Sequence, residues 1–379
     1  MSAIPTPNLS AYPELDTPAR LLFGPGPSMV HPRVTRAMTV PVVGYMDPLF
    51  LDILTKTADL LRYTFQTENR LTLTVSGTGT AGMEAAIANL VEPGDSVLAF
   101  AKGYFGLRLA EMARRYGGNV ETITKTWGEA FAPHEIKAAL DRRPAKVVTI
   151  VHAETSTGVC QPLDEIARIV HDQGGLLIVD AVTSLGGVPL KVDELGIDVC
   201  YSGTQKCLGC PPGLGLITVS PRAEEKLNAR KSAVPNFFLD LALLQKYWGS
   251  ERVYHHTASM PMHYGFYEGL RMVVEEGLEN RWARHRKNAE TLWKGLADLD
   301  LTLHVPHDIR LVTLTTVRIP DGVDEAQIRQ RLMQDYNIEI GAGLGDLKGK
   351  VWRIGLMGYS SREENVLLLL AALEKLLHK

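Results

Sequence analysis

The sequence of 379 residues predicts an α/β protein: a large domain with a mostly parallel sheet between helices, then a smaller C-terminal α+β domain. Short apolar strands alternate with helical stretches across residues 71–219, which is typical of a parallel sheet covered on both faces. After about residue 260 the pattern changes to long helical stretches. The composition, 45% apolar and 22% charged, is that of an ordinary globular protein with a sizeable core.

The N-terminal arm is expected to span residues 1–22, because Pro5, Pro7, Pro13 and Pro18 forbid a continuous helix there. It lacks the charged region followed by an apolar run that marks a secretory signal. No run approaches the roughly 18 to 20 apolar residues that span a bilayer. Four cysteines in so long a chain do not form a disulfide scaffold and suit a reducing compartment. A cytoplasmic location is therefore expected.

The large domain is expected to span residues 23–278. Its strands are predicted as short apolar runs, since a parallel sheet buried on both faces favours continuous rather than alternating apolar sequence. The helices between them should give right-handed crossovers. The expected strands are 71–75, 96–100, 147–151, 176–179, 199–202 and 215–219, with helices that include 82–90 and 163–173.

The small domain is expected to span residues 279–379. Helical stretches at 269–278 and 280–299 lead into it. Its own elements are predicted as strands at 312–319 and 351–356, helices at 324–336 and 362–378, and a Gly-rich loop at 341–345.

A loop of glycine and threonine, Ser76–Gly82, follows the first strand and precedes a helix. Glycines let a ligand approach the backbone closely, and the N-terminus of a helix offers unpaired N–H groups to a phosphate. The segment also matches Gly-x-Gly-x-x-Gly, so a dinucleotide-binding unit is an alternative, as is a turn without a ligand. The dinucleotide unit needs an acidic residue about 20 residues further on. The second strand ends instead in Phe100-Ala101-Lys102-Gly103.

The strand that ends in Asp180 is a second feature. An apolar run that ends in a carboxylate places this charge at the carboxyl edge of the sheet, where ligands of parallel sheets bind. A carboxylate beside a pyridine nitrogen keeps that nitrogen protonated and strengthens the ring as an electron sink. A turn or helix-capping role for Asp180 is the alternative.

Lys206 is the third feature, at the end of the segment Tyr201–Lys206 that follows another strand. A partly desolvated amine loses its proton more readily, and only the neutral amine attacks an aldehyde. A solvated surface lysine is the alternative. The loop, Asp180 and Lys206 occur in the order that supplies a phosphate cradle, a partner for a ring nitrogen and a reactive amine.

With these three features in place, the sequence resembles the class V aminotransferases of fold type I, and within them the alanine–glyoxylate and serine–pyruvate (serine–glyoxylate) group. The resemblance implies a pyridoxal 5'-phosphate cofactor and a homodimer with shared active sites. It also implies transamination between a small L-amino acid, alanine or serine, and a small 2-oxo acid, glyoxylate or pyruvate. The segments that carry it are Phe23–Pro27, Ser76–Gly79, Glu154–Val159, Tyr201–Lys206, Tyr254–Thr257 and Arg353–Gly355.

The resemblance assigns expected roles around the cofactor ring. Lys206 matches the Schiff-base lysine, which also moves the proton during catalysis, and Asp180 matches the partner of the pyridine nitrogen. Thr155 matches the hydroxyl that contacts the ring oxygen. Val182 matches the residue that packs on one face of the ring, and Phe105 falls where an aromatic ring stacks.

The resemblance also assigns phosphate and substrate contacts. Gly79, Thr80 and Gln205 fall where the family binds the phosphate, while Tyr254 and Thr257 match positions that reach it from the neighbouring subunit. A further match, Arg353, is the arginine that grips the substrate carboxylate, since guanidinium pairs with carboxylate in a bidentate manner. Relatives often carry His where Thr80 stands and Trp where Phe105 stands, which bears on cofactor affinity and substrate preference.

Other classes of protein remain as alternatives. Lyase, cysteine desulfurase or epimerase chemistry on the same cofactor is the first, and a nucleotide-binding Rossmann-type protein is the second. The Cys207-x-x-Cys210 pair is half a zinc site that no second pair completes, so no metal is expected. A net charge of -3 without a basic run argues against nucleic-acid or membrane partners.

Overall fold

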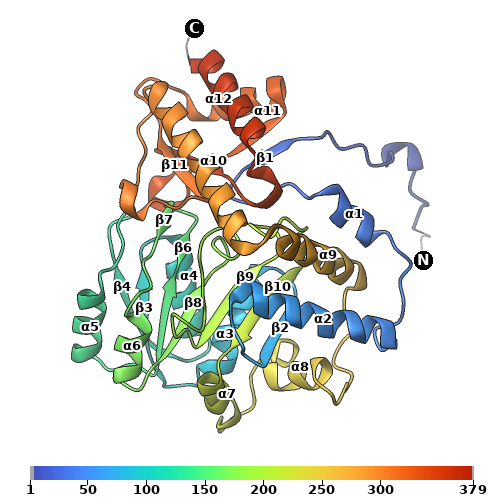
Figure 1. Ribbon diagram of the computed structural model, residues 1–379, viewed down its shortest axis with the longest axis vertical. Coiled ribbons are helices and arrows are strands. Elements are labelled where there is room, and N and C mark those ends of the chain that lie inside the picture. The colour runs from blue at the N-terminus through green and yellow to red at the C-terminus, as the bar shows by residue number, and fades with distance from the viewer. Residues whose placement is uncertain (1–3, 378–379) are drawn as a thin grey trace.

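The computed structural model describes residues 4–377 and contains a large sheet with helices on both faces and, next to it, a smaller sheet (Figure 1). The expected α/β class, with a mostly parallel sheet and a smaller α+β part, is confirmed. The helices, in chain order, are α1 (Pro32–Met38), α2 (Pro48–Phe65), α3 (Gly79–Leu90), α4 (Tyr104–Arg115), α5 (Pro133–Arg142), α6 (Ile166–Asp172), α7 (Pro221–Asn228), α8 (Leu241–Trp248), α9 (Met260–Glu276), α10 (Leu278–Asp298), α11 (Glu325–Tyr336) and α12 (Glu363–Leu377).

Within the described residues the larger sheet has seven strands. In spatial order these are β2 (Leu71–Ser76), β10 (Leu214–Val219), β9 (Val199–Gly203), β8 (Leu176–Asp180), β5 (Val147–Val151), β3 (Ser96–Ala101) and β4 (Asn119–Thr124). Every neighbouring pair from β9 to β4 is parallel, and β10 runs antiparallel to both β9 and β2. The carboxyl ends of β2, β3, β5, β8 and β9 therefore meet at one edge.

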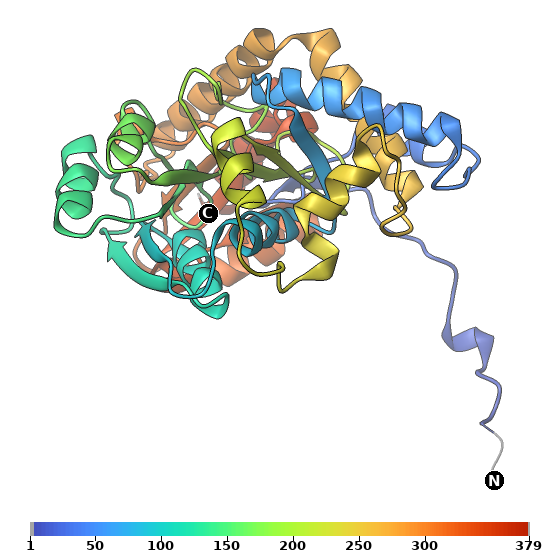
Figure 2. The same cartoon turned by 90° about the horizontal axis from the view of Figure 1, so that it is seen from below.

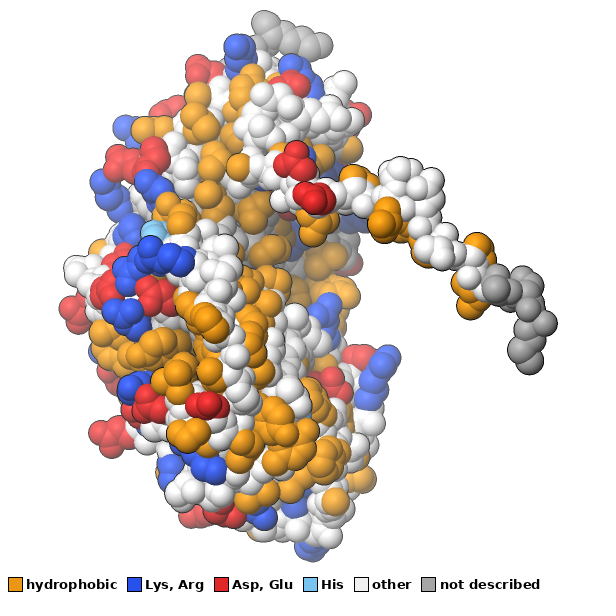
Figure 3. Space-filling model, turned by 90° about the vertical axis from the view of Figure 1, so that its right-hand side faces the viewer, with side chains coloured by type: hydrophobic (Ala, Val, Ile, Leu, Met, Phe, Trp, Pro, Cys, Tyr) orange, Lys and Arg blue, Asp and Glu red, His pale blue; other side chains and the backbone are white. Residues whose placement is uncertain are grey.

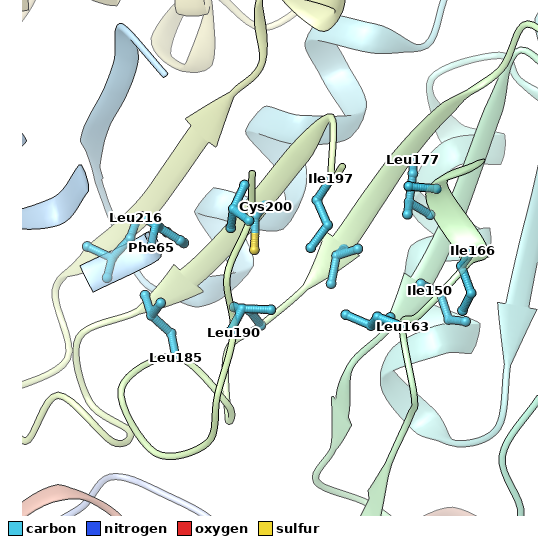
Figure 4. Close-up of a cluster of buried hydrophobic side chains, with 14 of the residues drawn as sticks. Phe65, Ile150, Leu163, Ile166, Leu177, Leu185, Leu190, Ile197, Cys200 and Leu216 are labelled. Carbon is cyan, nitrogen blue, oxygen red and sulfur yellow. The ribbon is translucent and has the colours of Figure 1, made fainter. Parts of the chain in front are cut away.

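Each face of this sheet is covered by its own set of helices, because successive side chains of a strand point to opposite faces. One face packs on α2, α5, α6 and α9, where Leu177, Cys200 and Leu216 of the strands meet Phe65 and Ile166 of the helices (Figure 4). The other face packs on α3, α4, α7 and α8. The continuous apolar sequence of the strands is the result of this double coverage.

The smaller sheet joins the two ends of the chain. Its order is β1 (Leu21–Phe23), β12 (Ile338–Ala342), β13 (Val351–Gly355) and β11 (Leu314–Arg318). Strand β1 pairs in parallel with β12, with Leu21 opposite Ile338. Helices α10, α11 and α12 share its hydrophobic core and lie at the top of Figure 1. The expected boundary at 278/279 falls at the first turn of α10, and the division into domains stays a prediction.

Some local features differ from what the sequence predicts. The irregular arm ends before β1 instead of at residue 22, because Leu21 and Leu22 belong to the smaller sheet. Part of the segment predicted as a Gly-rich loop is strand β12. Strand β4 was not predicted; it is a partly exposed edge strand without a continuous apolar run. In the range 4–377, no helix is long and apolar enough to cross a membrane.

Candidate active site

A cavity of about 190 Å³ opens at the carboxyl edge of the larger sheet. Each of its walls comes from a residue at or just after the end of a strand, or from the first turns of the helix that follows. The lining residues are Thr78, Gly79, Thr80, Met83, Phe105, Arg108, Val151, Ala153, Thr155, Asp180, Val182, Gln205 and Lys206. Eight of the predicted site residues are therefore brought together in one cavity.

The N-terminus of α3 forms one end of this cavity. Thr78 is the N-cap residue, and its side chain makes no capping hydrogen bond, so the first N–H groups of α3 are free of a side-chain cap. A Cβ atom on Gly79 would lie 3.1 Å from Cγ2 of Val182, which shows how closely the helix approaches the opposite wall. Backbone N–H groups at a helix N-terminus suit a phosphate.

Asp180 lies at the floor of the cavity and is buried. The backbone N–H of Val182 donates to Oδ1 at 2.8 Å, and the hydroxyl of Tyr201 donates to Oδ2 at 2.7 Å. Burial raises the pKa of Asp180 to about 6, although these two hydrogen bonds oppose the shift. The carboxylate is fixed in orientation and lacks a full counter-charge.

The amine of Lys206 faces the same cavity from the loop after β9. Its Nζ donates to the carbonyl oxygen of Pro25, and a Cβ atom on Gly26 would lie 2.5 Å from Nζ, so only glycine leaves room for it. Burial lowers the pKa of Lys206 to about 8. The neutral, nucleophilic form is therefore far more abundant than for a surface lysine.

Arg353 adjoins the cavity without lining it. Strand β13 carries the arginine, and its side chain donates from Nε to the carbonyl oxygen of Ala342 at 2.7 Å and from Nη1 to that of Thr155 at 3.2 Å. Burial lowers the pKa of Arg353 to about 10, which still leaves the guanidinium charged at neutral pH. Among the residues 4–377, no carboxylate forms an ion pair with it.

Tyr254 and Thr257 do not line this cavity. Both are exposed, on the loop between α8 and α9. The ring of Tyr254 lies 5.0 Å from that of Tyr45. The next two residues, His255 and His256, form a hydrogen-bonded pair. Nε2 of His256 lies 2.9 Å from Oγ of Ser76. The loop therefore lies beside the segment Ser76–Gly79 of its own chain, while Tyr254 points outward.

Arg108 is a cavity residue that the sequence did not reveal. It stands one turn into α4, its Nη1 donates to Oγ1 of Thr80 at 3.4 Å, and its guanidinium lies 5.0 Å from the ring of Tyr104 and 5.1 Å from that of Phe105. The signal that could have found it is helical spacing, since Arg108 follows Phe105 by three residues and shares its face. Its charge lies at the same end of the cavity as the N-terminus of α3.

The cysteines near Lys206 are buried. Burial raises the pKa of Cys207 and that of Cys210 to about 12, so both remain neutral thiols. Cys207 packs against Gly187 and donates to the carbonyl oxygen of Thr183. Over residues 4–377, no three His, Cys, Asp or Glu side chains are grouped so as to hold a metal ion.

The family described as aminotransferase class-V matches residues 42–367. The chain is 41% identical to the (S)-ureidoglycine–glyoxylate transaminase of Bacillus subtilis, over 97% of this chain and 93% of that protein. It is 42% identical to the alanine–glyoxylate aminotransferase of Rattus norvegicus, over 96% and 88%. A crystal structure of an alanine–glyoxylate aminotransferase from Nostoc sp. superposes with a TM-score of 0.96 at 53% identity, covering 98% of this chain and all of that one.

Proposed function

The chain belongs to the class V aminotransferase family, and from that premise we propose that it transfers the amino group of a small L-amino acid, alanine or serine, to a small 2-oxo acid, glyoxylate or pyruvate. It is an aminotransferase and its cofactor is pyridoxal 5'-phosphate. The observation that carries the proposal is one cavity that holds the Lys206 amine, the Asp180 carboxylate and the cradle at Gly79. The Rossmann-type alternative is set aside on family membership.

The residues of the cavity fit this cofactor. Asp180 offers a buried carboxylate that lacks a full counter-charge, which a protonated ring nitrogen would supply. The uncapped N-terminus of α3 and the guanidinium of Arg108 offer donors and positive charge to the phosphate. Oε1 of Gln205 is buried and has no hydrogen-bond partner within residues 4–377, and a half-turn of the amide would present its NH₂ group to the phosphate instead.

The mechanism follows from what the side chains can hold and move. When bound, the cofactor supplies an electron sink for negative charge at the α-carbon of the substrate. Lys206, with a lowered pKa, would take the proton from that carbon and return it as general base and acid. Asp180 would keep the ring nitrogen protonated, while Thr155 and Val182 would fix the ring between them. Arg353 would orient the substrate through its carboxylate.

The choice of small substrates rests on the sequence resemblance. Glyoxylate as acceptor is further supported by the names of the three relatives above, each of which includes it. Serine as donor and pyruvate as acceptor are kept in the proposal on the sequence resemblance.

Arg353→Lys should raise KM for the amino donor and for the oxo acid together, each by about tenfold, because one ammonium replaces a bidentate contact. Steady-state kinetics with both substrates varied measure this. Arg310→Lys is the matched control, since Arg310 also donates to a backbone carbonyl but lies outside the cavity. A fall in kcat with both KM values unchanged would show that Arg353 does not bind the carboxylate.

Arg108→Gln should weaken the binding of pyridoxal 5'-phosphate to the apoenzyme by about tenfold, because one charged contact to the phosphate is lost. Binding of pyridoxal, which lacks the phosphate, should not change. Quenching of protein fluorescence gives both dissociation constants. Arg115→Gln on the same helix, whose partner is the surface residue Glu111, is the control. If the substitution weakens the binding of pyridoxal 5'-phosphate and of pyridoxal equally, Arg108 does not contact the phosphate.

A homodimer with shared active sites is part of the proposal. Figure 2 shows the N-terminal arm extending away from the body, and hydrophobic side chains gather on the face from which it leaves (Figure 3). The arm exposes Ile4 and Leu15 almost fully, at 96% and 98%, and Tyr254 is 54% exposed. A second copy would cover these side chains and bring its Tyr254 and Thr257 to this phosphate cradle. Sedimentation of the holoenzyme at twice the 41.7 kDa chain mass supports this, and a monomer contradicts it.

The experiment that tests the proposed function is an absorption spectrum of the holoenzyme before and after excess alanine, and again after glyoxylate. Loss of the visible band with alanine and its recovery with glyoxylate would establish both half-reactions. A spectral change with serine but not with alanine would identify serine as the amino donor. A band that no amino donor changes would instead indicate lyase, desulfurase or epimerase chemistry. A cytoplasmic location is also proposed, on the grounds that all four cysteines are free thiols.

A further inference from the structure

Helix α4 is capped by residues from another part of the chain. Its N-cap residue, Gly103, has no side chain to offer. The backbone N–H of Tyr104 donates instead to Oγ of Ser156 at 2.9 Å, and that of Gly106 donates to Oε2 of Glu154 at 3.3 Å. Oε1 of Glu154 accepts from the backbone N–H and the hydroxyl of Ser156 at 3.1 and 2.6 Å. A carboxylate at this end also interacts favourably with the helix dipole.

Close packing makes this cap possible. A Cβ atom on Gly103 would lie 2.4 Å from Cγ of Glu154 and 2.4 Å from Oγ of Ser156, closer than any real contact. Its backbone is extended, at φ 175°, so space and not conformation requires glycine here. Because Gly103 has no side chain, the carboxylate of Glu154 can lie against the first turn of α4.

A buried lysine accompanies this carboxylate. Glu154 and Lys102 are both 0% exposed, which is rare for charged side chains without compensation. Nζ of Lys102 donates to the carbonyl oxygen of Val151, and the register partner of Val151 is Asp180. Burial lowers the pKa of Lys102 to about 8, while the carboxylate of Glu154 acts to raise it. Lys102 is thus a second buried ionisable group next to the strand that ends in Asp180.

The cap connects to two walls of the cavity. Phe105 stands in the first turn of α4, between the two N–H groups that Glu154 and Ser156 accept from, and it lines the cavity. Thr155 lies between the two capping residues and lines the cavity as well. A shift in the first turn of α4 would therefore displace the Phe105 ring.

We propose that Glu154 is a positioning residue that fixes Phe105 over the cofactor ring by capping α4. The inference rests on the proposed stacking of Phe105 on that ring. Glu154 itself does not line the cavity, so its effect on the cofactor must pass through its neighbours. Its role is thus separable from that of residues that touch the cofactor.

The test is a double-mutant cycle on the affinity of the apoenzyme for pyridoxal 5'-phosphate, with Glu154→Gln, Phe105→Ala and the double variant. Glu154→Gln keeps one acceptor oxygen but loses the charge, and should weaken binding about tenfold. In the Phe105→Ala background, Glu154→Gln should weaken cofactor binding by at most about twofold. Induced circular dichroism of the visible cofactor band should fall in parallel, since it reports how the ring is held.

Each outcome decides one point. An effect of Glu154→Gln that is as large without Phe105 as with it overturns the proposal. Unchanged binding in Phe105→Ala alone would instead show that the stacking is absent. Glu135→Gln is the matched control, because Glu135 accepts from Ala132 N–H at the start of α5, away from the cavity. If Glu154→Gln does not fold, the same cycle is run with Ser156→Ala, which keeps the Glu154 carboxylate but removes the Tyr104 contact and the hydroxyl hydrogen bond to Oε1 of Glu154. An effect on cofactor affinity that is as large without Phe105 as with it again overturns the proposal.

Discussion

Replacement of Lys206 with alanine is expected to lower kcat for transamination by a factor on the order of 10⁴. The amine at this position lines the cavity, and its pKa of about 8 suits proton transfer near neutral pH. Asp180 also lines the cavity and is held by two hydrogen bonds, from the N–H of Val182 and the hydroxyl of Tyr201. The effect is measured as the rate at which pyruvate forms from alanine in the presence of glyoxylate.

Two further measurements make this prediction specific. Added pyridoxal 5'-phosphate should still bind the Lys206→Ala protein, because the phosphate cradle is unchanged, but dialysis should remove it. Lys137→Ala is the control, since Lys137 pairs with Asp141 on the surface of α5. Turnover of Lys206→Ala within tenfold of the parent enzyme would assign the proton transfer to another group.

Asp180→Asn should lower kcat by a factor on the order of 10³, because a neutral amide cannot hold the ring nitrogen protonated. Asparagine has nearly the same shape and can keep a hydrogen bond to the N–H of Val182. Pyridoxal 5'-phosphate should therefore still bind. Steady-state kinetics together with the cofactor dissociation constant separate the loss of chemistry from a loss of binding. Loss of both in equal measure would show that Asp180 serves to bind and not to activate.

The same substitution predicts a pH effect on the stability of the apoenzyme. Burial raises the pKa of Asp180 from 3.8 in the unfolded chain to about 6, so between these values the folded state binds more protons. The contribution of Asp180 to stability is present at low pH and is lost as pH rises through 6. The asparagine in the Asp180→Asn variant does not titrate, so the stability of the variant relative to the parent should rise between pH 4 and 6 and then level off. Urea unfolding at four pH values tests this, and a constant difference contradicts it.

The sequence was sufficient where a local pattern determines position. The run Leu176–Val179 predicts a buried parallel strand, and the residue that ends such a strand must lie at the ligand edge of the sheet. Asp180 and Lys206 could therefore be placed in one cavity from strand ends alone. The loop Ser76–Gly82 was found for the same reason, although α3 begins at Gly79 and not at residue 82.

The sequence was insufficient where a contact joins distant segments. Gly341 looked like part of a loop, yet it lies in β12, where its missing side chain makes room for Pro25. The contacts of Arg108 and Glu154 could not be foreseen, because their partners, Thr80 and Gly106, come from other elements. Helical spacing from Phe105 places Arg108 on the right face of α4 but does not indicate its partner. Side chains that would serve a neighbouring subunit, such as Tyr254, can be recognised only by resemblance, since their partners lie outside the chain.

The pairing of β1 with β12 has a consequence for the order of folding. The segment after β1 also holds the lysine loop, since the N–H of Ser28 donates to the carbonyl oxygen of Gln205 at 2.9 Å and its hydroxyl to that of Lys206 at 2.8 Å. On a ribosome, β1 emerges first but can find its partner strand only when nearly the whole chain has been made. Contacts between such distant segments form late and slowly. The pocket around Lys206 should thus be among the last parts to become ordered, so nascent or C-terminally truncated chains should not retain the cofactor.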